Sequence, residues 1–466
     1  MKEFSYMDTV IIVTMIVVYI AITSWLTVRL RSKNTEQFMN AAKSMPAVVV
    51  GVLLMSEFIG AKSTVGTAES AFSNGMGAAW SVIAASIGYF LYAFFMVKRL
   101  YGSGEYTISG AIAQKYGNST KYSVSIIMMY ALLLVNVGNY ISGAAALSTI
   151  LKVNLPVAMC IIAVVSTFYF VFGGMKGVAW VTILHSLFKY VGIIIVLGVA
   201  LSLTGGLSPM IEKMPEYYFT WDGKVGASTV FAWVIGTVGA IFSTQFVVQA
   251  ISSNKTAEDA QKSALWAAFF CFPIGFMLAL IGVAAKYLYP SMKGLYALPI
   301  FMQSMNAYLA GIVATSLVAS VFVSVSTVAL AIASLAVKDF YVPFYKPTQE
   351  KEFRMTRILS VIIGFLPLIF VFFVPEILKL SFFTRAIRLS IAVVAMIAFY
   401  LPFFNSTRGA NIGIFGAAIA TSAWYMLGDP YGIDNMYIAL ISPAIFIGIE
   451  KVLWPNSKDS PAKSHA

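Results

Sequence analysis

The stretch GVLLMSEFIGAKSTVGTAESAF, residues 51–72, is apolar enough to enter a membrane but carries Glu57 and Lys62 in its middle. An ionisable group at membrane depth costs at least about 2.5–3.5 kcal/mol, so it must face a cavity or a partner. Non-helical backbone is tolerated at that depth only where it lines a cavity. We therefore expect the helix to unwind near Ser56 and Gly60 and to free carbonyls that suit a small, hard cation. The alternative is a glycine and serine face for close helix packing.

The composition around this stretch is that of a membrane protein. Of 466 residues, 59% are hydrophobic and only 11% are charged, whereas soluble domains contain about 25% charged residues. The many aromatic residues exclude a disordered chain. Cys160 and Cys271 both lie in apolar runs and give neither a disulfide framework nor a metal cluster. The net charge of +12 is scattered between apolar stretches, so we expect no nucleic-acid partner.

Thirteen stretches are long enough to cross a hydrocarbon core of about 30 Å as helices. They are residues 8–28, 45–71, 77–97, 122–151, 155–173, 177–204, 229–252, 262–289, 309–337, 355–374, 376–402, 411–427 and 435–454. Lysine and arginine concentrate after the odd-numbered spans, which places the N-terminus outside and the C-terminus in the cytoplasm. No secretory cleavage pattern precedes the first span, so we expect it to be retained. The sequence thus predicts an all-α, multi-pass protein of a bacterial or archaeal cell membrane.

Further ionisable residues lie in the sixth and eleventh spans. Arg385 and Arg388 share the eleventh span, and Thr182, His185 and Lys189 share one face of the sixth, at i, i+3 and i+7. Each needs a cavity or a partner, unless it snorkels to an interface or forms a structural ion pair. Lys189 falls near the bilayer centre, where it would either relay protons or act as a fixed cation in place of a metal ion.

The ninth span carries a stripe of hydroxyl groups. Ser320, Ser324, Thr327 and Ser334 fall near one helical face, and Ser326 lies one step to its side. Hydroxyl oxygens suit weak, reversible Na⁺ coordination. The alternative is interhelical hydrogen bonding, which is common for serine and threonine in membranes.

Soluble-type enzyme motifs are absent from the sequence. There is no Walker A or H-E-x-x-H pattern, and neither His185 nor His465 has the context of a catalytic triad. A membrane enzyme acting on lipid, with Glu57, Glu69 or His185 as catalytic groups, is a remote alternative. We expect a protein that is not an enzyme and has no organic cofactor.

Taken together and in order, several motifs resemble the sodium:solute symporter family over roughly residues 8–450. They are R-x-R-S-K-N-T-E-Q-F-M after the first span, A-E-S-A-F-S-N-G at 68–75, G-E-Y-T-I-S-G-A-I-A-Q-K-Y-G at 104–117, G-G-M-K-G-V-A-W-V-T at 173–182, Q-A-I-S-S-N-K-T-A-E-D-A at 249–260 and K-D-F-Y at 338–341. The family includes carriers of proline, glucose, pantothenate, monocarboxylates and sialic acid.

The resemblance implies a LeuT-like core of two inverted five-helix repeats. The expected division is an N-terminal helix and loop (1–44), the first repeat (45–204), an extracellular loop (205–228), the second repeat (229–402), two peripheral helices (403–454) and a cytoplasmic tail (455–466).

The resemblance also implies cation ligands in the second and ninth spans. The principal Na⁺ site would use Ser56, Ile59, Ser320 and Ser324, while Val323 departs from the hydroxyl that many members carry. A shifted register would bring in two further hydroxyl groups, those of Ser326 and Thr327. Some members close a second site near these two residues with an aspartate, and Thr182 occupies that position here. A single coupling ion is therefore expected.

Lys62 lies where the resemblance places the substrate cavity, at a position that is usually uncharged or acidic. A fixed cation favours an anionic solute, with Ser63, Thr64 and Arg385 as further contacts. The opposing interpretation is that Lys62 pairs with Glu57 and touches no substrate.

The expected function is Na⁺-coupled symport of a small anionic or zwitterionic solute, such as a carboxylate or an amino acid, by alternating access. The alternative keeps the fold but couples to protons, or to no ion, through Lys189, His185 and Glu57. Expected partners are the small-molecule solute and membrane lipid, with no obligatory protein partner. The sequence does not identify the solute.

Overall fold

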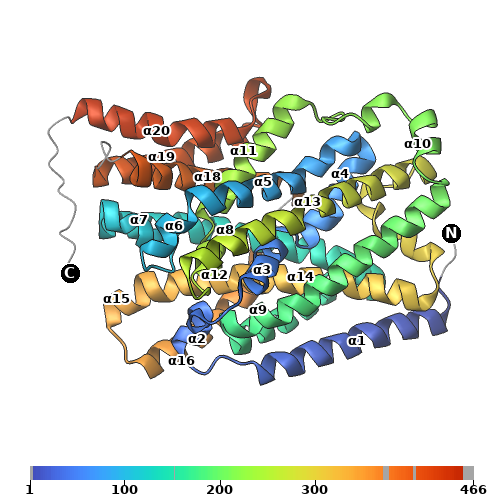
Figure 1. The fold of residues 1–466 in the computed structure, drawn as a ribbon, viewed down its shortest axis with the longest axis horizontal. Coiled ribbons are helices and arrows are strands. Elements are labelled where there is room, and N and C mark those ends of the chain that lie inside the picture. The colour runs from blue at the N-terminus through green and yellow to red at the C-terminus, as the bar shows by residue number, and fades with distance from the viewer. Residues whose placement is uncertain (1–3, 152, 371–376, 402–405, 455–466) are drawn as a thin grey trace.

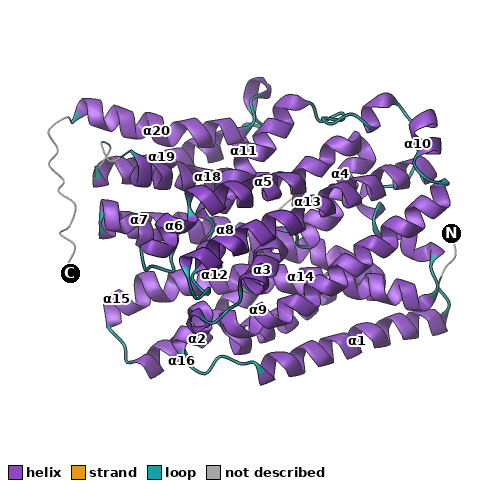
Figure 2. Cartoon of the chain, in the orientation of Figure 1, coloured by secondary structure: helices purple, strands orange, loops and turns teal. Residues whose placement is uncertain are grey.

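The structure is a computed structural model that describes residues 4–151, 153–370, 377–401 and 406–454. Figure 2 shows that these ranges are almost entirely helical, apart from one isolated bridge between Met45 and Asn254. The predicted tail 455–466 lies outside the described residues, as do 371–376 and 402–405 at the edges of predicted spans.

The helices run side by side in one bundle (Figure 1). The first half of the chain contains α1 (Tyr6–Arg29), α2 (Thr35–Asn40), α3 (Ala47–Phe58), α4 (Ala61–Asn74), α5 (Trp80–Phe95), α6 (Val97–Gly102), α7 (Ile108–Tyr116), α8 (Asn118–Leu151), α9 (Leu155–Thr204) and α10 (Ser208–Lys213). The second half contains α11 (Ala227–Ser243), α12 (Gln245–Ile251), α13 (Ala257–Leu288), α14 (Ala307–Leu335), α15 (Val342–Tyr345), α16 (Gln349–Phe365), α17 (Pro367–Phe370), α18 (Ile377–Tyr400), α19 (Thr407–Met426) and α20 (Asn435–Leu453).

In Figure 1 the start of α1 and the end of α20 lie at opposite ends of the bundle, as an odd number of crossings requires. Which end faces outside stays a prediction. Helix α14, the predicted ninth span, is buried along the stretch that crosses the membrane. Its hydroxyl stripe therefore faces other helices and not lipid.

The predicted interruption of the second span is confirmed. Helix α3 ends at Phe58, Ile59 has the non-helical angles φ −98° and ψ 65°, and α4 begins at Ala61. A Cβ atom on Gly60 would lie 1.8 Å from the Ser324 hydroxyl oxygen, so only glycine permits this approach to α14. Gly60 therefore also provides the close helix packing that the alternative interpretation predicts.

The predicted seventh span is broken as well. Helices α11 and α12 meet at Thr244 with a bend of 53°, and the amide of Thr244 still bonds to the Ala240 carbonyl. The sequence analysis does not predict this second break, because no ionisable residue or glycine marks it.

The count of membrane-crossing helices differs from the prediction. Among the described residues, nine helices are long and apolar enough, or ten if the bent pair α11 and α12 forms one span. Two of the nine, Lys62–Phe95 and Leu155–Thr204, are 34 and 50 residues long, although about 20 residues suffice for one crossing. Each contains residues of two predicted spans, and Gly174, with φ 54°, interrupts the second of them. Thirteen crossings therefore stay a prediction.

A buried carboxylate fastens the end of α14 to α7 and α8. Asp339, in the π-helical segment Ala336–Tyr341 that follows α14, is 0% exposed and lies 3.3 Å from the Lys121 amine. It also accepts hydrogen bonds from Ser109 and Ser125. These contacts tie together two of the motifs that the sequence analysis singles out, 104–117 and 338–341.

Replacing Asp339 with asparagine is expected to lower the stability of the purified protein by about 3 kcal/mol, because removing one member of a buried ion pair leaves the other uncompensated. The thermal unfolding midpoint in detergent measures the loss. The matched control is Glu258→Gln, which breaks the exposed Lys262–Glu258 pair and should leave the midpoint unchanged. Equal midpoints for Asp339→Asn and the parent would contradict the assigned role.

Candidate functional site

The break between α3 and α4 lies between two other helices, α9 and α14. From α9, Lys189 donates a hydrogen bond of 2.5 Å to the Ile59 carbonyl, and the Ser186 hydroxyl bonds to the Ser56 hydroxyl. From α14, Ser324 packs against Gly60. The structure therefore brings the second, sixth and ninth predicted spans together at the unwound turn.

The predicted ligands of the principal cation site gather here. The two serine hydroxyl groups donate hydrogen bonds within α14, which leaves their oxygen lone pairs available to a cation. The Ser324 hydroxyl donates to the Ser320 carbonyl at 2.9 Å, and the Ser320 hydroxyl donates to the Ser316 carbonyl. The Ile59 carbonyl accepts from the Lys189 ammonium. A metal ion at this carbonyl would have to share it with a positive charge. The site therefore does not fit Na⁺ while the Lys189 amine holds the Ile59 carbonyl.

The predicted second cation site corresponds to a separate small cavity. Thr182, Ser326 and Val323 line it together with His185 and Tyr169, and it measures about 10 Å³. The Thr182 hydroxyl has no hydrogen-bond partner among the described residues, and Ser326 donates to the Ser166 carbonyl at 3.2 Å.

Thr327 is also predicted to belong to the second cation site, but it lies apart from the small cavity. It does not line the small cavity, because its hydroxyl turns back to the Val323 carbonyl at 3.0 Å. Its assignment as a cation ligand stays a prediction.

A second polar cavity lies at the break and carries the predicted substrate contacts. Its lining includes Glu57, Lys62, Ser63, Arg385 and Arg388. The cavity measures about 20 Å³, which is room for about one water molecule. The structure is therefore closed around this site, and a solute would need it to widen.

Thr64 does not line this cavity, contrary to the prediction. Its hydroxyl donates to the Gly60 carbonyl at 3.2 Å in the first turn of α4, so it stabilises the helix start instead. Ser63 does line the cavity, and its hydroxyl donates to the Phe58 carbonyl across the break.

Positive charge exceeds negative charge in the polar cavity. The ion pairs of the described residues are Lys121–Asp339, Lys262–Glu258 and Lys338–Glu352, so none of the cavity's charged groups forms one. In particular, Glu57 and Lys62 do not pair in this structure. One carboxylate oxygen of Glu57 has no hydrogen-bond partner among the described residues.

Hydrogen bonds to neighbouring helices fix the side chains of the two arginines of α18. Arg385 donates to the Thr237 hydroxyl at 2.8 Å and to the Ser81 carbonyl at 3.4 Å. Arg388 donates to the Thr244 hydroxyl at 2.8 Å and lies over the Phe58 ring. Arg388 thus contacts both helix breaks.

Arg388 and Thr244 are site residues that the sequence did not lead us to expect. The three-residue spacing of Arg385 and Arg388 on one helix face is the signal that could have assigned both arginines to one cavity. Thr244 carries no comparable signal.

The residues predicted for proton coupling do not form one chain of hydrogen bonds. The His185 ring bonds to the Tyr19 hydroxyl of α1, whereas Lys189 bonds to Ile59. Glu57 belongs to the polar cavity instead.

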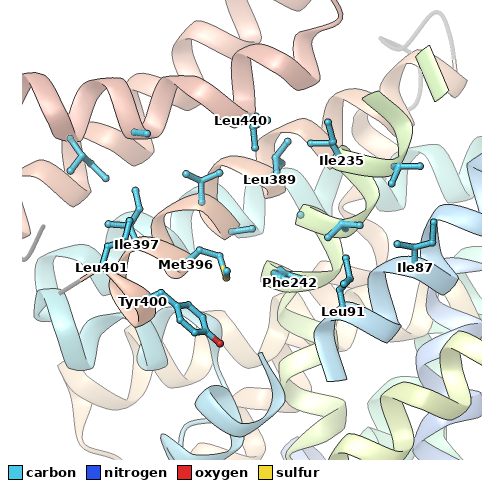
Figure 3. A pocket seen from close by; sticks show the side chains of 17 residues that line it. Ile87, Leu91, Ile235, Phe242, Leu389, Met396, Ile397, Tyr400, Leu401 and Leu440 are labelled. Atoms are coloured by element: carbon cyan, nitrogen blue, oxygen red, sulfur yellow. The ribbon is translucent and has the colours of Figure 1, made fainter. Parts of the chain in front are cut away.

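A larger cavity of about 760 Å³ lies elsewhere, between α5, α11, α18 and α20 (Figure 3). Its lining is aliphatic and aromatic: Ile87, Leu91, Val234, Ile235, Val238, Gly239, Phe242, Leu389, Ala392, Val393, Met396, Ile397, Tyr400, Leu401, Leu440, Ala444 and Ile447. The one side-chain hydroxyl, that of Tyr400, is already bonded to the Phe95 carbonyl. A charged solute would find no partner there, because binding sites need a few converging polar groups.

The chain resembles several curated transporters in sequence. The sodium/glucose cotransporter of Vibrio parahaemolyticus is 23% identical over 301 residues, which cover 60% of this chain and 55% of that protein. The high-affinity proline transporter PutP of Bacillus subtilis (strain 168) is 23% identical over 355 residues, covering 71% of this chain and 74% of that protein. The match thus spans only about half of the cotransporter's length.

Solved structures show the same fold. A Na⁺-coupled sialic acid symporter, in a substrate-bound outward-open state, has a TM-score of 0.81 at 18% identity and covers 95% of this chain and 98% of its own. Mhp1, a nucleobase-cation-symport-1 family transporter, has a TM-score of 0.59 at 14% identity and covers 93% and 98%. The predicted LeuT-like fold is confirmed.

A family model described as the sodium:solute symporter family matches residues 38–416, most of the chain. This is a family of transporters, which confirms the prediction that the protein is a multi-pass membrane transporter and not an enzyme. The chain belongs to the sodium:solute symporter family.

Proposed function

We propose that this protein is a secondary active transporter that carries a small organic anion or zwitterion, such as a carboxylate or an amino acid, across the membrane by alternating access. The observation that carries the proposal is the polar cavity at the helix break, where Lys62, Arg385 and Arg388 face a single carboxylate, Glu57. Buried charges without a counter-ion are costly, so a bound anion would stabilise this arrangement.

The donors in the cavity match a carboxylate. A guanidinium has five N–H donors, whereas Arg385 and Arg388 each donate two hydrogen bonds within the described residues. Arginine binds carboxylates in a two-pronged geometry. The first turn of α4 adds backbone N–H groups without intrahelical acceptors, and a helix N-terminus favours negative charge.

Membership of the family implies Na⁺ as the coupling ion, and Thr182, in place of an aspartate at the second cation site, leads us to expect one ion per solute. The LeuT-like fold supports two five-helix repeats over 45–204 and 229–402, with the N-terminus outside. The contact between Lys189 and Ile59 favours the alternative of a carrier that does not use Na⁺ at the principal site.

Uptake into proteoliposomes tests the proposal. Radiolabelled pyruvate, lactate and a set of amino acids would be compared with sugars and with the amides of the same acids, which lack the carboxylate charge. We expect at least one carboxylate to be accumulated and its amide to be taken up about 100-fold less, since a lost charge-assisted contact costs about 1.5–3 kcal/mol. Transport of neutral sugars alone would contradict the proposal.

A further inference from the structure

Lys189 is a buried lysine without an acidic partner in the described part of the chain. Its side chain is 1% exposed, and it forms none of the ion pairs of the described residues. Its side chain donates a hydrogen bond to the carbonyl of Ile59. A charge inside a membrane protein is retained where it has a function or a partner, and here the partner is the unwound turn itself.

The end of α3, where the Lys189 side chain binds, attracts positive charge. Ile59 directly follows the last residue of α3. The carbonyls of a final helical turn lack intrahelical donors and carry the negative end of the helix dipole. A cation at this point is therefore stabilised whether it is a metal ion or an ammonium group.

Helix α9 is held close to the break by more than this one bond. Ser186, one turn before Lys189, bonds to Ser56. On the other side of Lys189, a Cβ atom on Gly192 would lie 2.1 Å from the Ser316 hydroxyl oxygen, so α9 also lies directly against α14. The Lys189 amine thus binds Ile59, and the next residue, Gly60, lies against the predicted Na⁺ ligand Ser324 of α14.

We propose that the ammonium group of Lys189 is the resident cation of the helix break and replaces Na⁺ at the principal site. It supplies from within the chain the positive charge that holds the end of α3 against α14. Valine at position 323, where many family members carry a hydroxyl group, agrees with this proposal, because no hydroxyl ligand is needed where no metal ion is coordinated. The inference concerns this site alone and not the small cavity beside Thr182.

Direct binding of radiolabelled Na⁺ to the purified full-length protein in nanodiscs tests the proposal without any knowledge of the solute. Lys189→Gln removes the charge while keeping a donor for the Ile59 carbonyl, and Lys189→Arg is the matched control that keeps the charge. We expect Lys189→Gln to bind Na⁺ about tenfold or more tightly than the parent and Lys189→Arg, because the competing unit charge is gone. If Lys189→Gln does not fold, Lys189→Met serves as the second neutral variant.

Two results would overturn the proposal. One is Na⁺ binding by the parent that Ser324→Ala abolishes, since Na⁺ would then occupy the break beside Lys189. The other is a folded neutral variant that binds Na⁺ no more tightly than the parent. Folding of each variant is checked by its thermal midpoint.

The Na⁺-binding experiment does not depend on the proposed transport function. A second experiment, which measures uptake, rests on that function. In proteoliposomes, a solute that the parent accumulates equally with choline or Na⁺ outside would support the proposal, and Lys189→Gln should then gain a dependence on Na⁺. Uptake by the parent that requires Na⁺ and is abolished by Ser324→Ala would overturn the inference but leave the transport function standing. Absence of uptake for every solute would count against the proposed function and leave the binding result valid.

Discussion

Exchange of Lys62 for methionine is expected to lower the uptake of an organic anion by about 100-fold or more, because the bound anion would lose its buried partner charge, a loss of about 3–5 kcal/mol. Methionine keeps much of the apolar stem, which packs near Gly138, and removes the charge. The measurement is the initial rate of uptake into proteoliposomes for the carboxylate that the parent transports best.

Two variants separate the loss of charge from a loss of structure. Lys62→Arg keeps the charge and should retain part of the activity, although an arginine is a different donor from a lysine. Lys262→Met removes an exposed cation from α13 and should leave uptake unchanged. A Lys62→Met protein that transports the anion as fast as the parent would show that the polar cavity does not bind the solute.

Exchange of Gly60 for alanine is expected to abolish transport and to destabilise the protein by about 3 kcal/mol, the upper part of the range for overpacking. The added Cβ would lie 1.8 Å from the Ser324 hydroxyl oxygen and 2.7 Å from its Cβ. Either α4 moves away from α14 or the break changes shape. Thermal midpoint and uptake rate together measure the effect.

The double variant Gly60→Ala with Ser324→Gly removes the clash and should recover most of the lost stability. The control is Gly198→Ala in α9, where nothing lies within 4 Å of the added Cβ. That change should be neutral or raise the midpoint slightly, because alanine favours a helix over glycine by about 1 kcal/mol. A Gly60→Ala protein as stable and active as Gly198→Ala would contradict the described packing.

The interruption of the second span could be predicted because its cause is local. Ser56, Glu57, Gly60 and Lys62 are unsuitable for an unbroken lipid-facing helix, and their spacing alone locates the unwound turn. The hydroxyl stripe of α14 could also be predicted, because its residues recur at helical spacing. Ser63 and Arg385, which the family resemblance implies as substrate contacts, line a cavity beside the break, and their role in binding stays a prediction.

The pairing of side chains across helices could not be predicted, since it depends on how each helix is rotated about its axis. The sequence leaves open whether Lys189 relays protons or acts as a cation; only the placement of α9 brings it to Ile59. The break at Thr244 was missed because its residues also suit a continuous helix. Its contact with Arg388 is set by the packing of α11 on α18.

The most direct test of the transport site is ligand-induced thermal stabilisation of the purified protein, compared between the parent and Lys62→Met. Ligand at about 100 times its dissociation constant stabilises a folded protein by about 2.7 kcal/mol. We predict that a carboxylate or amino acid raises the midpoint of the parent, that its amide does not, and that Lys62→Met loses the response. Equal stabilisation of both proteins by the same solute would place the binding site elsewhere and contradict the account.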